Sequence, residues 1–484
     1  MLKFYLMFNP VVTYTNLLQR LHYIYLLYAI PMVLVTAALI PPFQNPDEPN
    51  HFLRAEQVSR MELIPAFHHQ YDTNAVKTAT PADSLVLYPT PGGFKADASI
   101  IAAASIFSPV EAQANVKVTD NMFFAARQIK WGTGITYFNF GNTAIYPPVV
   151  YLMPALGTAL GKLLHLSVIR TLSIARLLNA ALAVTLSFFA LLLAKRSKIL
   201  LFIVLLFPMV IELFASVSQD AILISCAFLL VAIIDRAEFH AVPKYQRRQI
   251  FTLIILMSLI GMAKPPYALC AVVFLFLSMK PKVKVALLGV PFLVIATWLY
   301  LDQANLSVIF APPSLRINAK LQALHILQHP LNFLSMFFDI DKVAVLANIR
   351  SFIGILGWLD TSFTLFYYFT AFSILVLGFV MNARFKTDNH FWLRIAALTG
   401  VVITIAALMT VQYITWTALD SPVLNGMQGR YLLPIFPFLA LALCGSAVPD
   451  KLSTLKMVFY SLILLFPLFT LISLTQLLIS RYYC

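Results

Sequence analysis

Charged side chains are scarce in this chain. Only 11% of its 484 residues are Asp, Glu, Lys or Arg, whereas 60% are hydrophobic, and the mean hydropathy is +0.83. A folded soluble protein cannot hide that much apolar surface, because it needs a largely polar exterior. The composition therefore excludes a soluble globular protein and indicates one that is embedded in a membrane.

Cysteine and acidic residues are also scarce. The four cysteines, Cys226, Cys270, Cys444 and Cys484, are scattered along the chain, so they form neither a disulfide framework nor a metal-ligand spacing. Asp and Glu number 20 against 34 Lys and Arg, which gives a net charge of +14. In a membrane protein such an excess mostly reflects basic cytoplasmic connections rather than nucleic-acid binding.

Long apolar runs are abundant, and many are long enough to cross the ~30 Å hydrocarbon layer as helices. The first follows Arg20 and ends in Pro41-Pro42-Phe43 without a small-x-small cleavage site, so we interpret it as an uncleaved span rather than a signal peptide. The sequence predicts a single all-α polytopic membrane domain over residues 1–484, with about eleven transmembrane helices. The predicted spans are 21–40, 172–194, 199–214, 221–235, 250–263, 266–280, 284–301, 363–381, 391–411, 431–448 and 455–478.

Charge predicts the orientation of these spans, because Lys and Arg accumulate in short cytoplasmic connections. The apolar block 146–164 would break the alternation if it crossed the membrane, and three prolines interrupt it. We therefore predict that it lies on the outer membrane surface as a helix. This leaves a large first extracytoplasmic loop at 41–170, which contains juxtamembrane helices, and a second at 302–362. The basic connections that should be cytoplasmic are 195–198, 236–248, 280–284, 384–386 and 451–456.

Ionisable residues at the ends of spans are informative in so apolar a chain. The first group, directly after the first span, contains Asp47, Glu48, His51 and Arg54. Pro49 fits the first position of a helix, and helical geometry that reaches back to Asp47 would put Asp47, His51 and Arg54 on one face. The group is either a solvated, capped helix start or part of a site.

Five further groups share two properties: each contains polar residues at the outer end of a span, and most have a plain structural alternative. Snorkelling to the interface is the alternative for Arg176, a helix N-cap for Asp220, and a capping turn for Asp360. All six groups lie on the outer side of the predicted topology, which favours one shared site. The five are Arg176 with Asn179, Ser218-Gln219-Asp220, Lys264-Pro265-Pro266-Tyr267, Gly357-Trp358-Leu359-Asp360 and Gln428-Gly429-Arg430-Tyr431.

These motifs, in this order, together with Tyr146-Pro147-Pro148 and Pro434, resemble the signature of a bacterial membrane family known as domain of unknown function 2142. The resemblance covers about residues 23–445. That family is in turn similar to the GT-C superfamily of membrane glycosyltransferases, which use a sugar carried on a polyprenyl phosphate and act on the extracytoplasmic side. In those enzymes one acidic residue follows the first span and another follows the third, and Asp47 and Asp220 match these positions.

The resemblance implies an inverting sugar transfer at the extracytoplasmic face of a bacterial inner membrane. Asp47 is then the expected base, with Glu48 as a second candidate, because the attacking hydroxyl must lose a proton. Lys264 and Arg430 are expected to bind the donor phosphate, assisted by Arg54 and Arg176. His51 and Asp220 would orient groups or hold a divalent cation, since some members of the superfamily use a metal and others do not. The remaining supporting residues are Tyr267, Gln428, Tyr431 and Asp360.

The implied partners are a polyprenyl-phosphate-linked sugar, an acceptor glycan, lipid or protein, and the surrounding membrane lipids. Three alternatives stay open. A transporter or flippase for a lipid-linked glycan would also need cations in a cavity, although transporters usually place them near the bilayer midplane within internal repeats, and this sequence has no visible repeat. A glycan polymerase or ligase, or a scaffold protein that has lost its activity, would have a similar composition.

Overall fold

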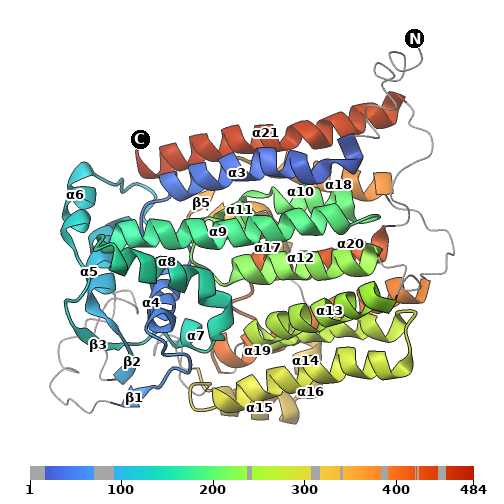
Figure 1. Ribbon diagram of the computed structural model, residues 1–484, viewed down its shortest axis with the longest axis horizontal. Coiled ribbons are helices and arrows are strands. Elements are labelled where there is room, and N and C mark those ends of the chain that lie inside the picture. Colours follow the sequence, from blue (N-terminus) through green and yellow to red (C-terminus); the bar gives the residue numbers. More distant parts are fainter. Residues whose placement is uncertain are drawn as a thin grey trace.

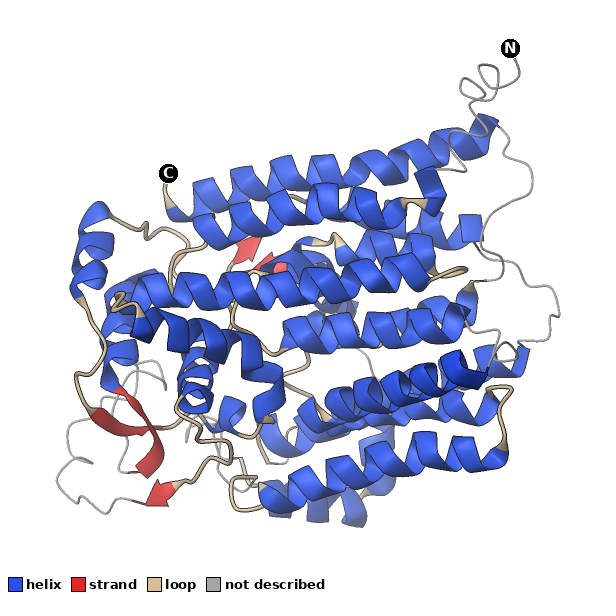
Figure 2. Cartoon of the chain, viewed as in Figure 1, coloured by secondary structure: helices blue, strands red, loops and turns tan. Residues whose placement is uncertain are grey.

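The computed structural model describes residues 17–69, 92–236, 243–306, 317–337, 342–382, 391–419, 421, 424–444 and 454–484. Within these ranges, six helices are long and apolar enough to cross a membrane. They run alongside one another in a helical bundle (Figures 1 and 2), so the predicted polytopic, mainly helical membrane protein is confirmed. The six are α3 (Leu21–Leu39), α9 (Val168–Leu193), α14 (Pro281–Leu301), α18 (Leu365–Asn382), α19 (Phe391–Trp416) and α21 (Thr454–Tyr482).

Three shorter helices form the centre of the bundle. They are α10 (Lys198–Leu205), α11 (Pro208–Phe214) and α12 (Asp220–Arg236), and every side chain from 199 to 235 is buried. A helix that is apolar on all sides belongs in an interior. The sequence predicted one span at 199–214, but the structure has two helices there, because Pro208 cannot continue the hydrogen-bond ladder and instead begins α11.

Two further apolar blocks also differ from the regular α-helical spans that the sequence predicts. α13 (Pro243–Ala263) is a continuous helix, whereas the predicted span 266–280 is a 3₁₀ helix, η4 (Pro265–Phe276). The predicted span 431–448 is divided into η6 (Gly429–Leu432) and the short α20 (Phe436–Leu443), and its last residues lie outside the described ranges. Prolines at 265, 266, 434 and 437 remove backbone donors in both blocks, which favours short or tighter helices. Eleven regular α-helical spans are therefore not what the described residues form.

The first loop is more elaborate than a set of juxtamembrane helices. Its three strands form an antiparallel sheet in the order β1-β2-β3, with Phe94 opposite Phe138 and Asp97 opposite Ile135. The all-α prediction missed this small sheet. The loop comprises α4 (Glu48–Ser59), β1 (His68–His69), β2 (Gly92–Asp97), α5 (Ala98–Phe107), η2 (Ser108–Val110), α6 (Asp120–Gln128), β3 (Ile135–Phe138), α7 (Gly141–Ala144), η3 (Pro148–Tyr151) and α8 (Leu152–Leu163).

The second loop contains three helices and a strand pair. β4 (Ile355–Leu356) pairs antiparallel with β5 (Thr361–Ser362), and the Gly357-Trp358-Leu359-Asp360 motif forms the turn between them. The helices are α15 (Ala319–Gln328), α16 (Pro330–Met336) and α17 (Lys342–Gly354).

Helix α8 contains most of the block that was predicted not to cross the membrane. The apolar helix Pro148–Leu163 falls short of a spanning length, and α8 packs antiparallel along the first turns of α9. A Cβ at Gly157 would lie 2.6 Å from the Ala175 Cα, and one at Gly161 would lie 2.3 Å from the Thr171 hydroxyl. These glycines let the two helix backbones approach closely, so α8 covers the outer part of α9 instead of lying apart from it.

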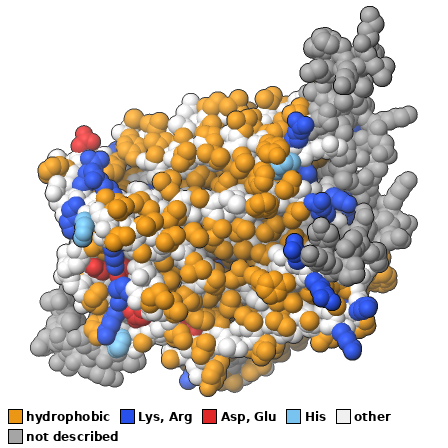
Figure 3. All heavy atoms as spheres, viewed as in Figure 1, with side chains coloured by type: hydrophobic (Ala, Val, Ile, Leu, Met, Phe, Trp, Pro, Cys, Tyr) orange, Lys and Arg blue, Asp and Glu red, His pale blue; other side chains and the backbone are white. Residues whose placement is uncertain are grey.

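The two ends of the bundle differ in charge. Lys198 lies at the end where α3 begins, because its Nζ donates to the backbone oxygen of Gln19, 3.4 Å away. The opposite end carries α4, α8 and the sheet (Figure 1). On the face in Figure 3, hydrophobic side chains cover the middle, Lys and Arg appear at both ends, and Asp and Glu gather towards the end with the sheet. On this face, the two ends of the bundle therefore differ in their acidic side chains.

Candidate functional site

Asp47 occupies an unusual backbone position at the start of α4. It is the N-cap residue, but its φ of +54° lies in the left-handed region, and its side chain makes no cap hydrogen bond. Non-glycine residues in this region carry strain that is often found at functional sites. The carboxylate instead contacts Arg430, whose Nη2 donates to Asp47 Oδ2 at 3.0 Å. The cap residue is thus turned towards another part of the bundle.

Arg430 reaches Asp47 from η6, close to the other end of the sequence. Its side chain is buried, and its Nε has no hydrogen-bond partner in the part of the chain that the structure describes. The preceding Gly429 donates its N–H to the Ser351 hydroxyl at 2.9 Å, and a Cβ at this position would lie 2.0 Å from the Asn348 oxygen. Only glycine allows η6 to lie this close to α17, so α17 fixes the position of Arg430.

A second ion pair joins Asp220, the first residue of α12, to Lys264, which lies between α13 and η4. Lys264 Nζ is 3.1 Å from Asp220 Oδ1 and sits 4.5 Å from the centre of the Tyr431 ring. The turn before Asp220 is held by Asn179, whose amide donates to the backbone oxygens of Ser216 and Ser218. This contact gives Asn179, predicted as part of a motif with Arg176, a positioning role.

His51 lies among the charged residues of both pairs. Burial lowers the pKa of His51 to about 4, although the negative charges of Asp47 and Asp220 oppose this effect. The imidazole is therefore neutral near pH 7, with one nitrogen to donate and one to accept. Its Nδ1 shares a hydrogen bond with the Tyr151 hydroxyl at 2.7 Å, which belongs to η3.

The structure thus brings seven of the residues predicted from the sequence into one cluster. The electrostatic environment of His51 includes both ion pairs, and Tyr267 joins the cluster because its hydroxyl donates to the Tyr431 backbone oxygen at 2.9 Å. Four separate regions of the chain supply these side chains, all next to or within helix ends. We call this set the polar cluster: Asp47, His51, Asp220, Lys264, Tyr267, Arg430 and Tyr431.

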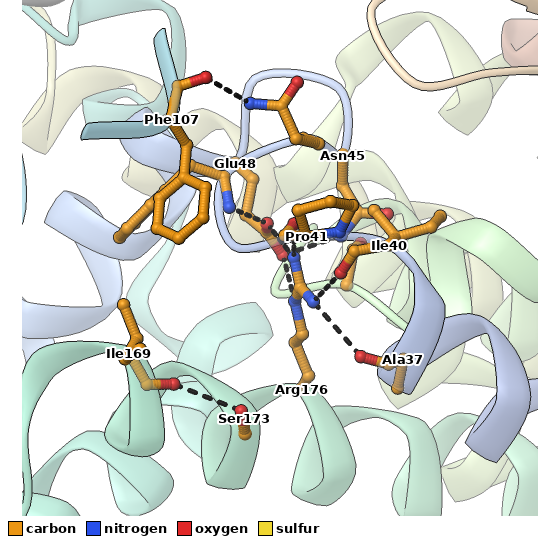
Figure 4. A network of polar contacts seen from close by, with 12 residues as sticks. Ala37, Ile40, Pro41, Asn45, Glu48, Phe107, Ile169, Ser173 and Arg176 are labelled. Atoms are coloured by element: carbon orange, nitrogen blue, oxygen red, sulfur yellow. Dashed lines mark hydrogen bonds and ion pairs between the residues drawn. The ribbon is translucent and has the colours of Figure 1, made fainter. Parts of the chain in front are cut away.

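Glu48 and Arg176 form a separate, buried ion pair. Arg176 Nε lies 2.8 Å from Glu48 Oε1, and its other nitrogens bind the second carboxylate oxygen and the backbone oxygens of Ala37, Ile40 and Pro41 (Figure 4). The exposed fractions of the two side chains are 3% and 0%. These contacts occupy the carboxylate and the guanidinium, and they hold the end of α3 against α9. We therefore assign them a structural role in place of the predicted catalytic and phosphate-binding roles.

Arg54 is also placed differently from the prediction. Its guanidinium is fully buried and donates to the backbone oxygens of Glu62, Leu63 and Tyr146. Burial lowers the pKa of Arg54 to about 10. The side chain points to the chain that leaves α4, not to Asp47, so it ties the first loop together and is not positioned to bind a donor phosphate.

The two remaining predicted residues, Asp360 and Gln428, have different surroundings. Asp360 pairs with Arg481, whose Nη2 is 2.6 Å from its Oδ2 and also donates to the backbone oxygen of Val110. Asp360 therefore supports the first loop through Arg481 and not the charges of the cluster. Gln428 precedes Gly429, and its buried Oε1 has no hydrogen-bond partner among the described residues.

Sequence reasoning missed two groups near the cluster. Tyr151 follows the Tyr146-Pro147-Pro148 motif by three residues, and this position close to a motif could have marked it as a candidate site residue. Glu111 follows η2, in a part of the first loop that carries no motif. It is half-buried, and burial together with the charge of Asp47 raises the pKa of Glu111 to about 7. The hydrogen bond from Gln44 to the Phe107 oxygen, at 3.1 Å, ties its segment to that of Asp47.

The polar cluster has two carboxylates and one imidazole as potential metal ligands. Among the described residues, no group of three or more His, Cys, Asp or Glu side chains is arranged to hold a metal ion.

A known family model covers the whole region that contains these motifs. The family model described as predicted membrane protein (DUF2142) matches residues 31–439 of the chain. The chain belongs to this family. The match spans the region from within α3 to within α20 and thus includes every residue of the polar cluster. No curated protein and no solved structure matches the chain.

Proposed function

We propose that the protein is a membrane glycosyltransferase that moves a sugar from a polyprenyl-phosphate donor to an extracytoplasmic acceptor. The observation that carries this proposal is the polar cluster itself. The ion pair between the partly exposed carboxylate of Asp47 and Arg430 lies in one cluster with the Lys264–Asp220 pair, at the helix ends opposite the basic connection 195–198. Sugar transfer from a lipid phosphate needs a base and a phosphate-binding pair of cations, and it needs them where lipid headgroups lie.

The proposed reaction is a single displacement at the anomeric carbon. Asp47 accepts the proton of the attacking acceptor hydroxyl while the bond from the sugar to the phosphate oxygen breaks. Arg430 and Lys264 stabilise the charge on the departing phosphate. The sugar is transferred with inversion, and the polyprenyl phosphate leaves as an anion. Neutral His51 supplies a hydrogen bond that orients a sugar or acceptor hydroxyl.

The embedding of the protein fits such a donor. A polyprenyl chain lies in the bilayer, with its phosphate at the level of the headgroups, and a bundle end can hold both without lifting the lipid into water. Fixing donor and acceptor together removes much of the entropic barrier of a two-substrate reaction. We accordingly propose that the protein works at the outer face of a bacterial inner membrane.

Transport of an anionic lipid is the second candidate, and one observation favours it. Glu212 in α11 is fully buried, with Oε1 bound by the Gly357 N–H at 2.6 Å and Oε2 without a partner. Buried intramembrane carboxyls are typical of transporters that move protons. However, Lys264 and Arg430 form their ion pairs with Asp220 and Asp47 and not with Glu212, so the transferase explains more of the cluster.

The two candidates differ in what accumulates in cells. Polyprenyl-linked sugars and envelope glycans can be measured by mass spectrometry in cells that lack the protein and that carry either the wild-type chain or Asp47→Asn at equal abundance. The transferase predicts that Asp47→Asn matches the deletion, with one sugar missing from a glycan and its lipid-linked donor accumulating.

Glu212→Gln provides the complementary arm of this experiment. A proton-coupled transporter should lose function on this substitution and retain it in Asp47→Asn. A glycan profile that follows Glu212 and not Asp47 would overturn the transferase proposal in favour of transport.

A further inference from the structure

The two ion pairs of the polar cluster differ in the solvent exposure of their side chains. In the Lys264–Asp220 pair, both side chains are largely buried, with exposed fractions of 16% and 9%. In the Arg430–Asp47 pair the arginine is buried, at 8%, whereas the aspartate is 33% exposed. A competing anion can therefore approach Arg430 from the side of Asp47, while Lys264 and Asp220 shield each other.

Both members of the Arg430–Asp47 pair have structural features that favour an exchange of partners. Arg430 is fixed by the packing of Gly429 on α17, and its buried Nε has no partner among the described residues, so it has donor capacity beyond the bond to Asp47. Asp47 is held at a φ of +54° with no cap hydrogen bond. A rotation of its side chain away from Arg430 would cost only the ion pair, whereas Arg430 without an anion would be an uncompensated buried charge.

We propose that the Arg430–Asp47 ion pair is a latch that the donor phosphate opens. The anionic phosphate takes the place of the Asp47 carboxylate on Arg430, and Asp47 is released towards the acceptor. This inference rests on the proposed function and deepens it, because it assigns the order of events. While Arg430 donates to Asp47 Oδ2, the carboxylate is held at Arg430, so Asp47 becomes available to an acceptor hydroxyl only after the donor has bound.

The latch gives the reaction a fixed sequence. The donor binds first, the base is released second, and the acceptor hydroxyl is deprotonated last. A single negative charge replaces another on Arg430, so the buried site keeps its charge balance throughout the exchange. Phosphate occupancy then both presents the sugar and activates the base.

The test is equilibrium binding of polyprenyl monophosphate, the donor lipid without its sugar, to the purified full-length chain in detergent by native mass spectrometry. If Asp47 competes with the phosphate for Arg430, Asp47→Asn should tighten binding on the order of tenfold. Arg430→Gln should weaken it. Glu111→Gln is the matched control, because it removes a neighbouring carboxyl with no hydrogen bond to Arg430, and it should change binding by less than about twofold at physiological salt.

A second measurement reads the release of Asp47 directly. Carbodiimide-mediated amine coupling, mapped by peptide mass spectrometry, should modify Asp47 of the wild-type chain faster when polyprenyl monophosphate is bound, while the exposed Asp120 reacts at an unchanged rate. Equal affinity in Asp47→Asn and the wild type, or slower coupling at Asp47 with the lipid bound, would overturn the latch alone. A wild-type chain that does not bind polyprenyl monophosphate would overturn the proposed function as well.

Discussion

At the scale of single residues, Asp47 shows how a local rule can be broken for a distant contact. An aspartate before a helix normally caps it, and here the backbone is turned so that the carboxylate reaches Arg430, 383 residues along the chain. A residue held in a disfavoured conformation persists only where its surroundings determine it. In this conformation the Asp47 carboxylate accepts a hydrogen bond from Arg430 in place of the usual cap contact.

We expect Asp47→Asn to reduce the rate of sugar transfer by about 10²–10⁴-fold, the usual contribution of a general base. The measurement is transfer from a polyprenyl-phosphate sugar by the purified chain in lipid vesicles. Asp120→Asn, an exposed aspartate in the same loop, is the control and should retain the wild-type rate. An Asp47→Asn enzyme within a few-fold of the wild type would show that another group accepts the proton.

The buried Glu48–Arg176 pair leads to a prediction about stability. Removing one partner leaves an uncompensated buried charge, which costs about 3–5 kcal/mol. We expect Arg176→Met to lower the midpoint of thermal unfolding in detergent markedly and the double variant with Glu48→Met to restore much of the loss. An Arg176→Met chain that keeps its stability but no longer binds polyprenyl monophosphate would return Arg176 to the phosphate site.

Glu111 predicts a dependence of stability on pH. Its pKa is raised to about 7 in the folded chain, first by burial and then by Asp47, whereas an unfolded chain has the ordinary value of about 4.3. The folded state therefore binds more protons between these two values, and its stability falls as the pH rises through them. The Glu111→Gln chain should lose less stability between about pH 5 and 7 than the wild type. Parallel curves of unfolding midpoint against pH would contradict this.

At the scale of elements, the position of Arg430 depends on the contact between η6 and α17. A Cβ at Gly429 would lie 2.0 Å from the Asn348 oxygen and 2.4 Å from the Phe352 nitrogen, both backbone atoms. We expect Gly429→Ala to separate the two elements and to lower both transfer activity and the affinity for polyprenyl monophosphate.

Gly289→Ala is the matched control for this variant. Gly289 lies within α14, and a Cβ there would meet nothing within 4 Å, so alanine should keep or raise the stability of the helix. If Gly429→Ala behaved like Gly289→Ala in activity and binding, the packing of η6 on α17 would not be what positions Arg430.

The elements also show what the sequence can and cannot predict. The spans 21–40 and 172–194 correspond closely to α3 and α9, because a long uninterrupted apolar run has few alternatives in a membrane. Blocks with internal prolines were predicted less well, since their length alone does not reveal where the ladder breaks.

The candidate site was predictable to a different extent. Motifs at helix ends pointed to most of the polar cluster, because the ends of antiparallel spans meet at one membrane face. The pairing of charges was not predictable. Arg176 and Arg430 look alike in the sequence, and only the packing of α3 on α9 makes one of them structural. No motif in the sequence pointed to Glu111, because it comes close to Asp47 through the fold of the first loop.

At the scale of the whole molecule, the charge pattern predicts which end faces which compartment. Single cysteines can test it in a chain in which the exposed Cys484 is changed to Ser. We expect Asn115→Cys, in the first loop, to react with a membrane-impermeant maleimide in intact spheroplasts, and Lys195→Cys to react only after permeabilisation. Both positions are exposed in the structure. Labelling of Lys195→Cys in intact spheroplasts would reverse the topology and move the site to the cytoplasmic side.

The separation of Asp47 and Arg430 in the sequence also has a consequence for biosynthesis. A ribosome makes Asp47 early and Arg430 only after most of the bundle has been inserted, and Arg481, which holds the first loop at Val110, comes later still. The nascent chain thus contains Asp47, the proposed base, for the whole interval before its ion-pair partner Arg430 has been made. We expect such an incompletely translated chain to be inactive on the lipid pool, because it lacks one of the two cations proposed to bind the donor phosphate.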